Sequence, residues 1–180
     1  MIRRLFTAAA VLLALALPAA AQTKKPDPQN TLYLDTTYGR VVIALRPDIA
    51  PKHAERLKTL AREGFYNGVP FHRVIEGFMA QTGDGQFGNG TGGSKYPDLP
   101  AEFSKVPFKR GTVGMARTSD PNSANSQFFI TFGDASFLNG QYTVVGEVVS
   151  GMEFIDKIKR GEPVANPDKI IKMQVAADAK

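Results

Sequence analysis

The chain has 180 residues, with 22 lysines and arginines, 17 aspartates and glutamates, and no cysteine. This length suits one domain that can bury a sizeable core, and the lack of cysteine excludes disulfides as a source of its stability. The formal net charge of +5 is not gathered into basic runs, so we expect no nucleic-acid partner. Two histidines without cysteine disfavour a zinc site, and we expect neither a metal nor another cofactor.

The N-terminus has the pattern of a secretory signal peptide. A basic start, Met1-Ile2-Arg3-Arg4, precedes an apolar run from Leu5 to Leu17 and the small residues Ala19-Ala20-Ala21. The run is too short to span a bilayer comfortably, so we expect cleavage after Ala21 and no stable membrane insertion; a retained anchor is the alternative. We therefore predict three segments: a signal peptide at residues 1–21, a flexible linker at 22–30 and a folded domain at 31–180.

The first elements of the domain are a hairpin and a helix. Two β-rich runs, Thr31–Thr37 and Arg40–Arg46, are separated by Tyr38-Gly39 and predict the hairpin. Pro51 fits the first turn of a helix that ends near Gly64. His53 lies on this helix among charged neighbours, and we interpret it as a solvated surface histidine. The apolar residues of the helix recur at helical spacing: Ala54, Leu57, Leu60 and Ala61.

The rest of the chain is dominated by short strands. Asp134–Leu138 is predicted as a turn or single helical loop, and Met152, Phe154, Ile155 and Ile158 mark a second helix that ends near Gly161. Seven or eight strands with two helices and no regular alternation favour a closed or nearly closed antiparallel sheet with helices over its ends. The further predicted strands are Phe71–Ile75, Phe78–Thr82, Gly111–Arg117, Ser126–Phe132, Tyr142–Val149 and Ile170–Val175, the last with Ile171, Met173 and Val175 on one face.

A glycine-rich segment, Gly83–Gly93, twice matches the spacing of a dinucleotide-binding fingerprint. That fingerprint requires a helix that opens directly after the glycines, so that its N-terminus meets a pyrophosphate. Here Ser94-Lys95-Tyr96-Pro97-Asp98-Leu99-Pro100 follows and cannot begin a helix. We interpret the segment as a surface loop.

The side-chain period of the strands gives the first indication of a site. In the run from Ser126, Gln127, Phe129 and Thr131 share one face, whereas the opposite face is wholly apolar and belongs to a core. A face that carries an amide beside an aromatic ring is better suited to contact a ligand than to face water. Likewise Arg73 shares a face with Phe71 and Ile75, and Met79 shares a face with Gln81.

Several reaction classes find no support in these residues. No nucleophile elbow or paired-carboxylate signature is present, and a regular strand turns His72 away from Arg73. Arg73 cannot act as an acid or base, because a guanidinium keeps its proton in proteins. It can donate hydrogen bonds and stabilise charge in a dry site. Taken alone, Arg73 fits better as a structural arginine paired with an acid, and its surroundings reverse that preference.

Several motifs occur together in a fixed order. They are Phe71-His72-Arg73-Val74-Ile75 with Gly77-Phe78-Met79 and Gln81, Gly111-Thr112-Val113-Gly114-Met115-Ala116, and Ser126-Gln127-Phe128-Phe129-Ile130 with Phe137-Leu138. From about Thr31 to Val175 the chain resembles the cyclophilins, the cyclosporin-binding type of peptidyl-prolyl cis-trans isomerase. The resemblance implies an all-β fold, an eight-stranded antiparallel closed β-barrel capped by two α-helices.

The resemblance also implies an activity, the isomerisation of X-Pro peptide bonds (EC 5.2.1.8). Such a bond rotates slowly because the nitrogen lone pair is delocalised into the carbonyl, which leaves a barrier near ~20 kcal/mol. A guanidinium aimed at the prolyl nitrogen lowers the barrier, because this nitrogen becomes a good acceptor only in the twisted transition state. A ~10⁵-fold acceleration corresponds to about 7 kcal/mol.

Site residues are implied in the same way. Arg73 is the expected catalytic donor, and Gln81 and Gln127 are the amides expected to hold substrate carbonyl groups and orient Arg73. Ala116 and Arg117 are expected to line the peptide groove, with His72 close by. The predicted proline pocket consists of Phe78, Met79, Phe129 and Leu138, which without the resemblance are better interpreted as ordinary core.

Two departures from the family pattern bear on ligands. Phe137 stands where many members have tryptophan, and Tyr142 stands where many have histidine. Both keep an aromatic wall at the substrate-binding groove, but the indole donor is lost. We therefore do not expect strong cyclosporin binding.

Three functions are compatible with these patterns. The leading one is an exported, periplasmic isomerase that acts on proline-containing segments of unfolded client proteins in the envelope, or on secreted proteins, and works as a monomer. The second is a non-catalytic proline-peptide-binding module or holdase chaperone, and the third is a barrel for a small ligand. Arg73, Gln81 and Gln127 together favour the first.

Overall fold

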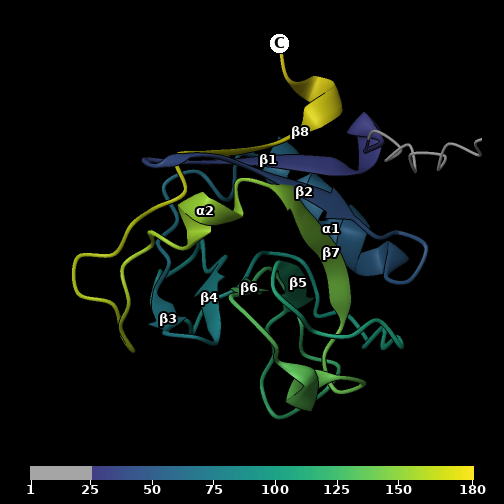
Figure 1. Ribbon diagram of the computed structural model, residues 1–180. Coiled ribbons are helices and arrows are strands. Elements are labelled where there is room, and N and C mark those ends of the chain that lie inside the picture. The colour runs from purple at the N-terminus through teal and green to yellow at the C-terminus, as the bar shows by residue number, and fades with distance from the viewer. Residues whose placement is uncertain (1–25) are drawn as a thin grey trace, which may run out of the picture.

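The computed structural model describes residues 26–180, in which eight strands form one antiparallel sheet (Figure 1). Their order across the sheet is β3-β4-β6-β5-β7-β2-β1-β8. The strands are β1 (Thr31–Thr36), β2 (Gly39–Leu45), β3 (Arg73–Ile75), β4 (Met79–Thr82), β5 (Thr112–Met115), β6 (Phe128–Thr131), β7 (Val144–Ser150) and β8 (Lys172–Val175). The helices are α1 (Pro51–Arg62), α2 (Met152–Ile155) and short 3-10 helices at Pro28–Asn30, Ser136–Leu138 and Ala176–Asp178.

The predicted signal peptide, residues 1–21, and the start of the predicted linker lie outside the described residues. The end of that linker, Pro28–Asn30, forms a 3-10 helix that the Asp27 side chain caps by accepting from the Gln29 N–H. Within residues 26–180, no helix combines the length and apolar character needed to cross a membrane.

The sheet is an open half-barrel, so the predicted closed barrel is wrong on this point. The outermost strands, β3 and β8, do not pair with each other. Where they approach, only the bridge between Pro70 and Lys169 and a few loop hydrogen bonds join the two segments, such as Phe71 N–H to the Asp168 carbonyl at 2.9 Å. Pro70 has no N–H to donate, and Gly68 with a φ of 79° interrupts the extended backbone, so a regular ladder cannot continue.

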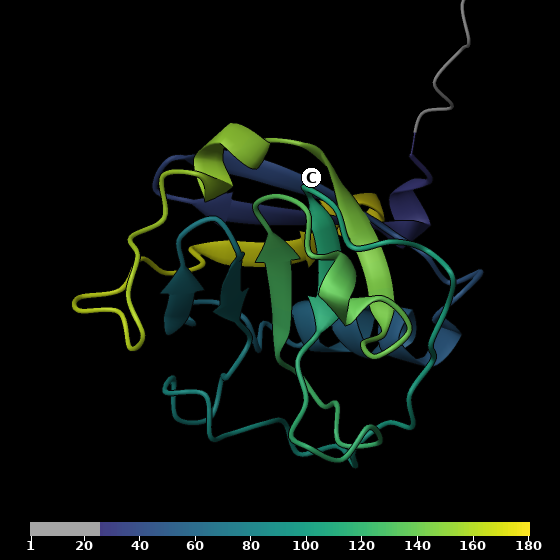
Figure 2. The ribbon, with the colours of Figure 1, turned by 60° about the horizontal axis from the view of Figure 1, so that its bottom comes forward.

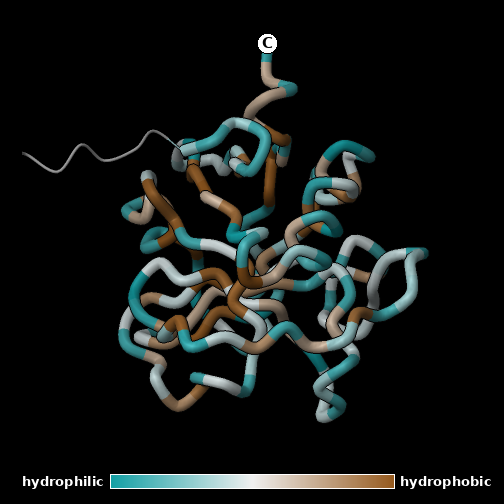
Figure 3. The backbone as a smooth tube through the Cα atoms, turned by 90° about the vertical axis from the view of Figure 1, so that its right-hand side faces the viewer, coloured by the Kyte–Doolittle hydropathy of each residue, from teal (hydrophilic) through white to brown (hydrophobic). Residues whose placement is uncertain are grey.

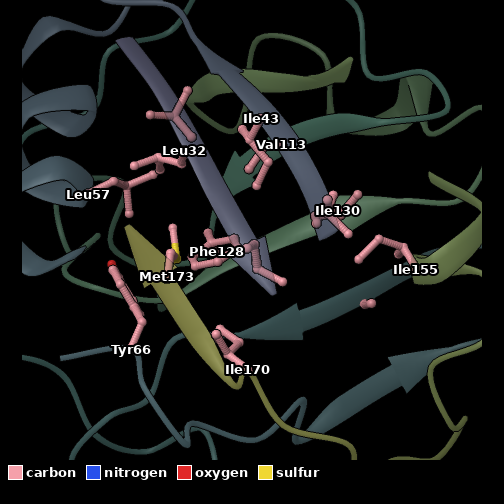
Figure 4. Packing of buried hydrophobic residues seen from close by; sticks show 14 of the residues in the cluster. Leu32, Ile43, Leu57, Tyr66, Val113, Phe128, Ile130, Ile155, Ile170 and Met173 are labelled. Atoms are coloured by element: carbon pink, nitrogen blue, oxygen red, sulfur yellow. The ribbon is translucent and has the colours of Figure 1, made fainter. Parts of the chain in front are cut away.

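The two faces of the sheet bury two separate apolar clusters. The larger one fills the space between the curled sheet and α1, and Figure 4 shows Leu32, Ile43, Phe128 and Met173 converging in it with Leu57 of α1. The apolar face predicted for β6 is confirmed, since Phe128 and Ile130 are fully buried there. The smaller cluster contains Met79, Phe108, Phe129, Ala135, Leu138 and Val144. Figure 3 shows the apolar stretches in the interior and mostly hydrophilic loops around them.

His53 is not a surface residue, which corrects the prediction from its charged neighbours. Its side chain is 0% exposed and its Nδ1 lies 2.6 Å from Glu102 Oε2. Glu102 also accepts from the N–H groups of Lys52 and His53, both at 3.2 Å, and so caps α1, whose own N-cap residue, Ala50, offers no side-chain acceptor. Glu102 is 49 residues away in sequence, so the helix pattern could not reveal it.

The second helix and the last strand are shorter than predicted. Regular α-helix covers only Met152–Ile155, and the chain continues to Ile158 in tighter turns, such as Ile158 N–H to the Ile155 carbonyl at 3.1 Å. Ile158 is nevertheless buried as its spacing predicted. Ile171 precedes β8 and is 56% exposed, so it does not share the buried face of Met173 and Val175.

Candidate active site

The candidate site is built on one row of residues that runs across the sheet. Register pairs Arg73 on β3 with Gln81 on β4, Gln81 with Phe129 on β6, and Phe129 with Gly114 on β5. Because directly opposite residues in an antiparallel sheet point to the same side, this row places a guanidinium, an amide and an aromatic ring next to one another. Figure 2 shows the strands that carry the row lying side by side.

A cleft of about 410 Å³ opens above this row. Its floor belongs to the smaller apolar cluster, because Met79 is 1% and Phe129 is 4% exposed, yet both line the cleft. Such a concave apolar space with a few polar groups at its rim is typical of small-ligand and peptide sites. The lining residues are Arg73, Phe78, Met79, Gln81, Ala116, Arg117, Phe129, Phe137, Leu138, Gln141 and Tyr142.

Aromatic rings shape the apolar part of the cleft. Phe129 stacks on Phe108 beneath it, with centroids 5.7 Å apart, and meets the edge of Tyr142 at 5.9 Å. Phe78 and Phe137, which also line the cleft, have ring centroids 5.2 Å apart. Phe137 is 62% exposed, so its ring forms an outer lip rather than the floor. The resulting slot has ring faces and edges on several sides, which suits a small apolar ring such as that of proline.

A relay of side-chain amides connects Arg73 to the glycine-rich loop. Arg73 Nη1 donates to Gln81 Oε1 at 3.4 Å, and Gln81 Nε2 donates to Gln127 Oε1 at 3.0 Å. Gln127 Nε2 in turn donates to the carbonyls of Gly90 and Gly92, at 2.9 and 2.8 Å. Each amide is thereby fixed in orientation by its neighbours, as expected for a satisfied polar network at the edge of a core.

The glycine-rich loop is itself organised by Asp84, which is 1% exposed. Its carboxylate accepts from the backbone N–H groups of Gln86, Phe87, Asn89, Gly90 and Gly92, at 2.9 to 3.1 Å. Burial alone would raise the pKa of Asp84, but these N–H donors outweigh it and lower the pKa to about 2. The prediction of a surface loop rather than a dinucleotide fingerprint agrees with this structure, since the N–H groups point at Asp84.

Arg73 is held at the rim of the cleft with its side chain 39% exposed. Besides the contact to Gln81, its Nε lies 2.5 Å from Oε1 of Glu162, on the loop before β8. Arg73 therefore does pair with an acid, Glu162, as expected for an arginine with a structural role. The guanidinium is nevertheless not turned into the core, because it lines the cleft.

Arg117 closes the other end of the cleft. Its guanidinium lies 4.3 Å from the centroid of the Tyr142 ring and donates to the carbonyls of Gln141 and Thr118, each at 2.8 Å. A cation over a ring face with its donors bound to carbonyls is strongly restricted. Arg117 thus fixes Tyr142 as a wall of the cleft.

The structure brings together all predicted site residues except His72. The His72 side chain is 7% exposed and does not line the cleft, and its Nε2 faces Gly90 in the glycine-rich loop. Burial lowers the pKa of His72, so its ring is neutral at neutral pH. Gln127 reaches the site through Gln81 and lines a second, polar hollow of about 360 Å³ beside the cleft.

Sequence reasoning missed some residues at this site. Gln141 lines the cleft, and Glu162 contacts Arg73 from a sequence distance of 89 residues. Neither carries a local signal, because each is brought in by a loop. The polar hollow, with Asn125 and Ser123 among its lining residues, was also not predicted.

The sequence profile of the family described as cyclophilin type peptidyl-prolyl cis-trans isomerase/CLD matches residues 31–175. The chain belongs to the cyclophilin-type peptidyl-prolyl cis-trans isomerases. It is 61% identical to a probable peptidyl-prolyl cis-trans isomerase of Brucella suis, with 96% of each chain covered. It is 39% identical to a peptidyl-prolyl cis-trans isomerase of Helicobacter pylori, covering 78% of this chain and 88% of that protein.

Solved cyclophilin structures have the same fold. A cyclophilin from Hirschia baltica superposes with a TM-score of 0.81 at 29% identity, covering 87% of this chain and 77% of the other. A cyclophilin-type isomerase from Cryptosporidium parvum, crystallised in the presence of the dipeptide Ala-Pro, gives a TM-score of 0.74 at 28% identity over 81% and 98% of the two chains. The predicted family and peptidyl-prolyl isomerase activity are therefore confirmed, and the cleft described above is the candidate active site of this cyclophilin.

Proposed function

We propose that this cyclophilin isomerises X-Pro bonds by hydrogen-bond donation from Arg73 to the prolyl nitrogen while the proline ring occupies the apolar slot beside Phe129. The observation that carries the proposal is the position of the Arg73 guanidinium, exposed at the rim of a cleft whose floor is Met79 and Phe129. A peptide in the cleft excludes water from this rim, and a charge-assisted hydrogen bond is stronger there than in water.

The relay of amides supports the same mechanism. Gln81 accepts from Nη1 of Arg73 at 3.4 Å and is itself oriented by Gln127, so the relay directs one edge of the guanidinium toward the cleft. The lone pair of the prolyl nitrogen is available only in the twisted geometry, so the interaction favours the transition state over either planar isomer. No covalent step and no proton transfer are required.

Proline-containing peptides and unfolded client chains are the proposed substrates. Support comes from the slot of aromatic rings and from the related Cryptosporidium parvum structure, which was determined in the presence of Ala-Pro. The pattern of a signal peptide at residues 1–21 supports export and a role in the folding of periplasmic or secreted proteins. The proposal includes action as a monomer and weak cyclosporin binding, the latter because Phe137 offers no indole donor.

The role of Arg73 can be tested by measuring isomerisation of a short X-Pro peptide with the parent and with Arg73→Ala. We expect kcat/KM to fall about 100-fold or more, as for loss of one donor to a transition state, whereas the Kd for the peptide changes far less. Arg62→Ala is a matched control, because Arg62 is 41% exposed and pairs with Asp178 at 2.9 Å away from the cleft.

The non-catalytic binding module or holdase considered from the sequence is not supported, because the chain belongs to a family of peptidyl-prolyl isomerases. A change in peptide binding alone in Arg73→Ala would assign the guanidinium to binding and not to catalysis. An active parent with an equally active Arg73→Ala variant would instead overturn the role proposed for the guanidinium.

A further inference from the structure

The loop between α2 and β8 lies along the outer edge of β3, next to Arg73. Figures 1 and 2 show this loop, in yellow-green, beside β3 from two directions. Val74 and Gly161 exchange two backbone hydrogen bonds of 2.8 Å, and the Val164 N–H donates to the His72 carbonyl at 3.1 Å. On the strand, the bonded residues His72 and Val74 flank Arg73. On the loop, the bonded residues Gly161 and Val164 flank Glu162.

This backbone pairing determines where the Glu162 carboxylate lies. With Gly161 and Val164 both bound to the strand, the short segment between them cannot move away without breaking backbone hydrogen bonds. Glu162 is thereby presented to Arg73, and its Oε1 reaches Nε at 2.5 Å. The same loop is bound a second time through Arg160, whose Nε donates to Glu76 Oε2 at 2.6 Å.

Arg73 has few other constraints on its orientation. Its contact to Gln81 is long, at 3.4 Å, and its side chain is 39% exposed. Arginine has a flexible stem, so one long hydrogen bond leaves the planar head free to rotate. A second acceptor on a different nitrogen, Nε, occupies the edge formed by Nε and Nη2 and defines the plane of the guanidinium, so Nη1 stays directed toward Gln81.

We propose that Glu162 is a positioning residue for catalysis: its carboxylate holds the Nε edge of Arg73 so that Nη1 stays on the side of Gln81 and the cleft. This inference rests on the proposed catalytic role of Arg73. Glu162 does not line the cleft, so it acts on turnover through Arg73 and not by touching the peptide. We therefore expect substitution of Glu162 to change kcat and to leave KM nearly unchanged.

The experiment compares Glu162→Ala and Glu162→Gln in the isomerisation assay. Glu162→Ala removes the acceptor for Nε, and we expect kcat to fall about fivefold with KM changed less than about twofold, the size expected for one exposed charged contact. Glu162→Gln keeps a side-chain oxygen that can accept from Nε, so kcat should return to within about twofold of the parent. Glu76→Ala serves as the matched control: it breaks the other ion pair of the same loop without touching Arg73.

A double-mutant cycle with Arg73→Ala separates this inference from the proposed function. If Glu162 acts through Arg73, Glu162→Ala should have no further effect in the Arg73→Ala background. A large effect of Arg73→Ala with none from Glu162→Ala overturns the positioning role and leaves the proposed function intact. An increase in kcat in Glu162→Ala, or an equal loss in Glu76→Ala, also overturns it, since Glu162 would then restrain Arg73 or merely anchor the loop. No effect of Arg73→Ala would overturn the proposed function itself.

Discussion

At the scale of single residues, the cleft depends on a glycine as much as on the side chains that line it. Gly114 lies directly opposite Phe129 in the sheet. A methyl group added at Gly114 would lie 2.5 Å from the Phe129 ring and 2.6 Å from Phe108, closer than real contacts allow. Gly114 therefore leaves the space in which the Phe129 ring can lie flat on Phe108 and form the floor of the slot.

Gly114→Ala tests this steric requirement. We expect Phe129 to be displaced, with a loss of about 1–3 kcal/mol in the free energy of unfolding and a fall in kcat/KM of about tenfold or more. Isomerisation assays and urea denaturation measure the two effects. Gly133→Ala is the control, because a methyl group there meets only the Gly77 carbonyl oxygen at 3.8 Å. Equal activities of the two variants would contradict the role given to Gly114.

At the scale of elements, the start of α1 is stabilised by a residue from a distant loop. Glu102 accepts from the first N–H groups of the helix and from the buried ring of His53, while its own N–H donates to Thr143 Oγ1 at 2.9 Å. Glu102 thereby joins its own loop to the helix through its carboxylate and to Thr143, the residue before β7, through its backbone N–H.

Replacing this carboxylate should destabilise the fold without abolishing the chemistry. In Glu102→Ala the helix N-terminus loses its cap and His53 Nδ1 loses its partner inside the protein, so we expect a loss of about 1–3 kcal/mol in unfolding free energy. Urea denaturation measures it. Glu55→Ala, on the same helix but with a side chain 61% exposed, should change stability by less than about 0.5 kcal/mol. A stable Glu102→Ala variant would contradict the capping role.

The sequence predicted the local pattern of single strands but not the contacts between distant segments. Alternation in Ser126–Phe132 was enough to separate Phe129 from the core face, because a period of two is a local property of a strand. The contacts of Glu102 with His53 and of Glu162 with Arg73 join segments 49 and 89 residues apart. Periodicity has no information about such contacts. The open edge of the sheet escaped prediction for the same reason, since it depends on how loops meet.

At the scale of the whole molecule, acid should unfold the protein partly through Asp84. Its pKa of about 2 in the folded state lies below the ordinary value of 3.8. A lowered carboxyl pKa stabilises the fold above pH 3.8, by about 2–3 kcal/mol for a shift of this size, and the contribution disappears as pH falls through about 2. The parent should therefore lose stability between about pH 5 and pH 2.

Asp84→Asn should show whether this carboxylate is responsible. The variant cannot carry the charge that the five N–H groups surround, so it should be less stable than the parent at pH 7 and lose less stability on acidification. Urea denaturation at several pH values gives the free energy of unfolding of the parent and of the variant as a function of pH. Parallel pH profiles for parent and variant would assign the acid sensitivity to other groups. Because Gly90 and Gly92 bind Gln127, kcat should also fall in Asp84→Asn.

The half-barrel leaves two strands that other polypeptides could in principle extend. At β3 the backbone groups of Val74 are bound by Gly161, and at β8 the N–H of Met173 donates to the side chain of Asn67 at 3.0 Å. Neither partner is a strand, so neither offers a new ladder to a third chain. With both borders of its sheet covered in this way, the protein is protected from edge-to-edge pairing with extended segments of other chains, and so from aggregation by that route.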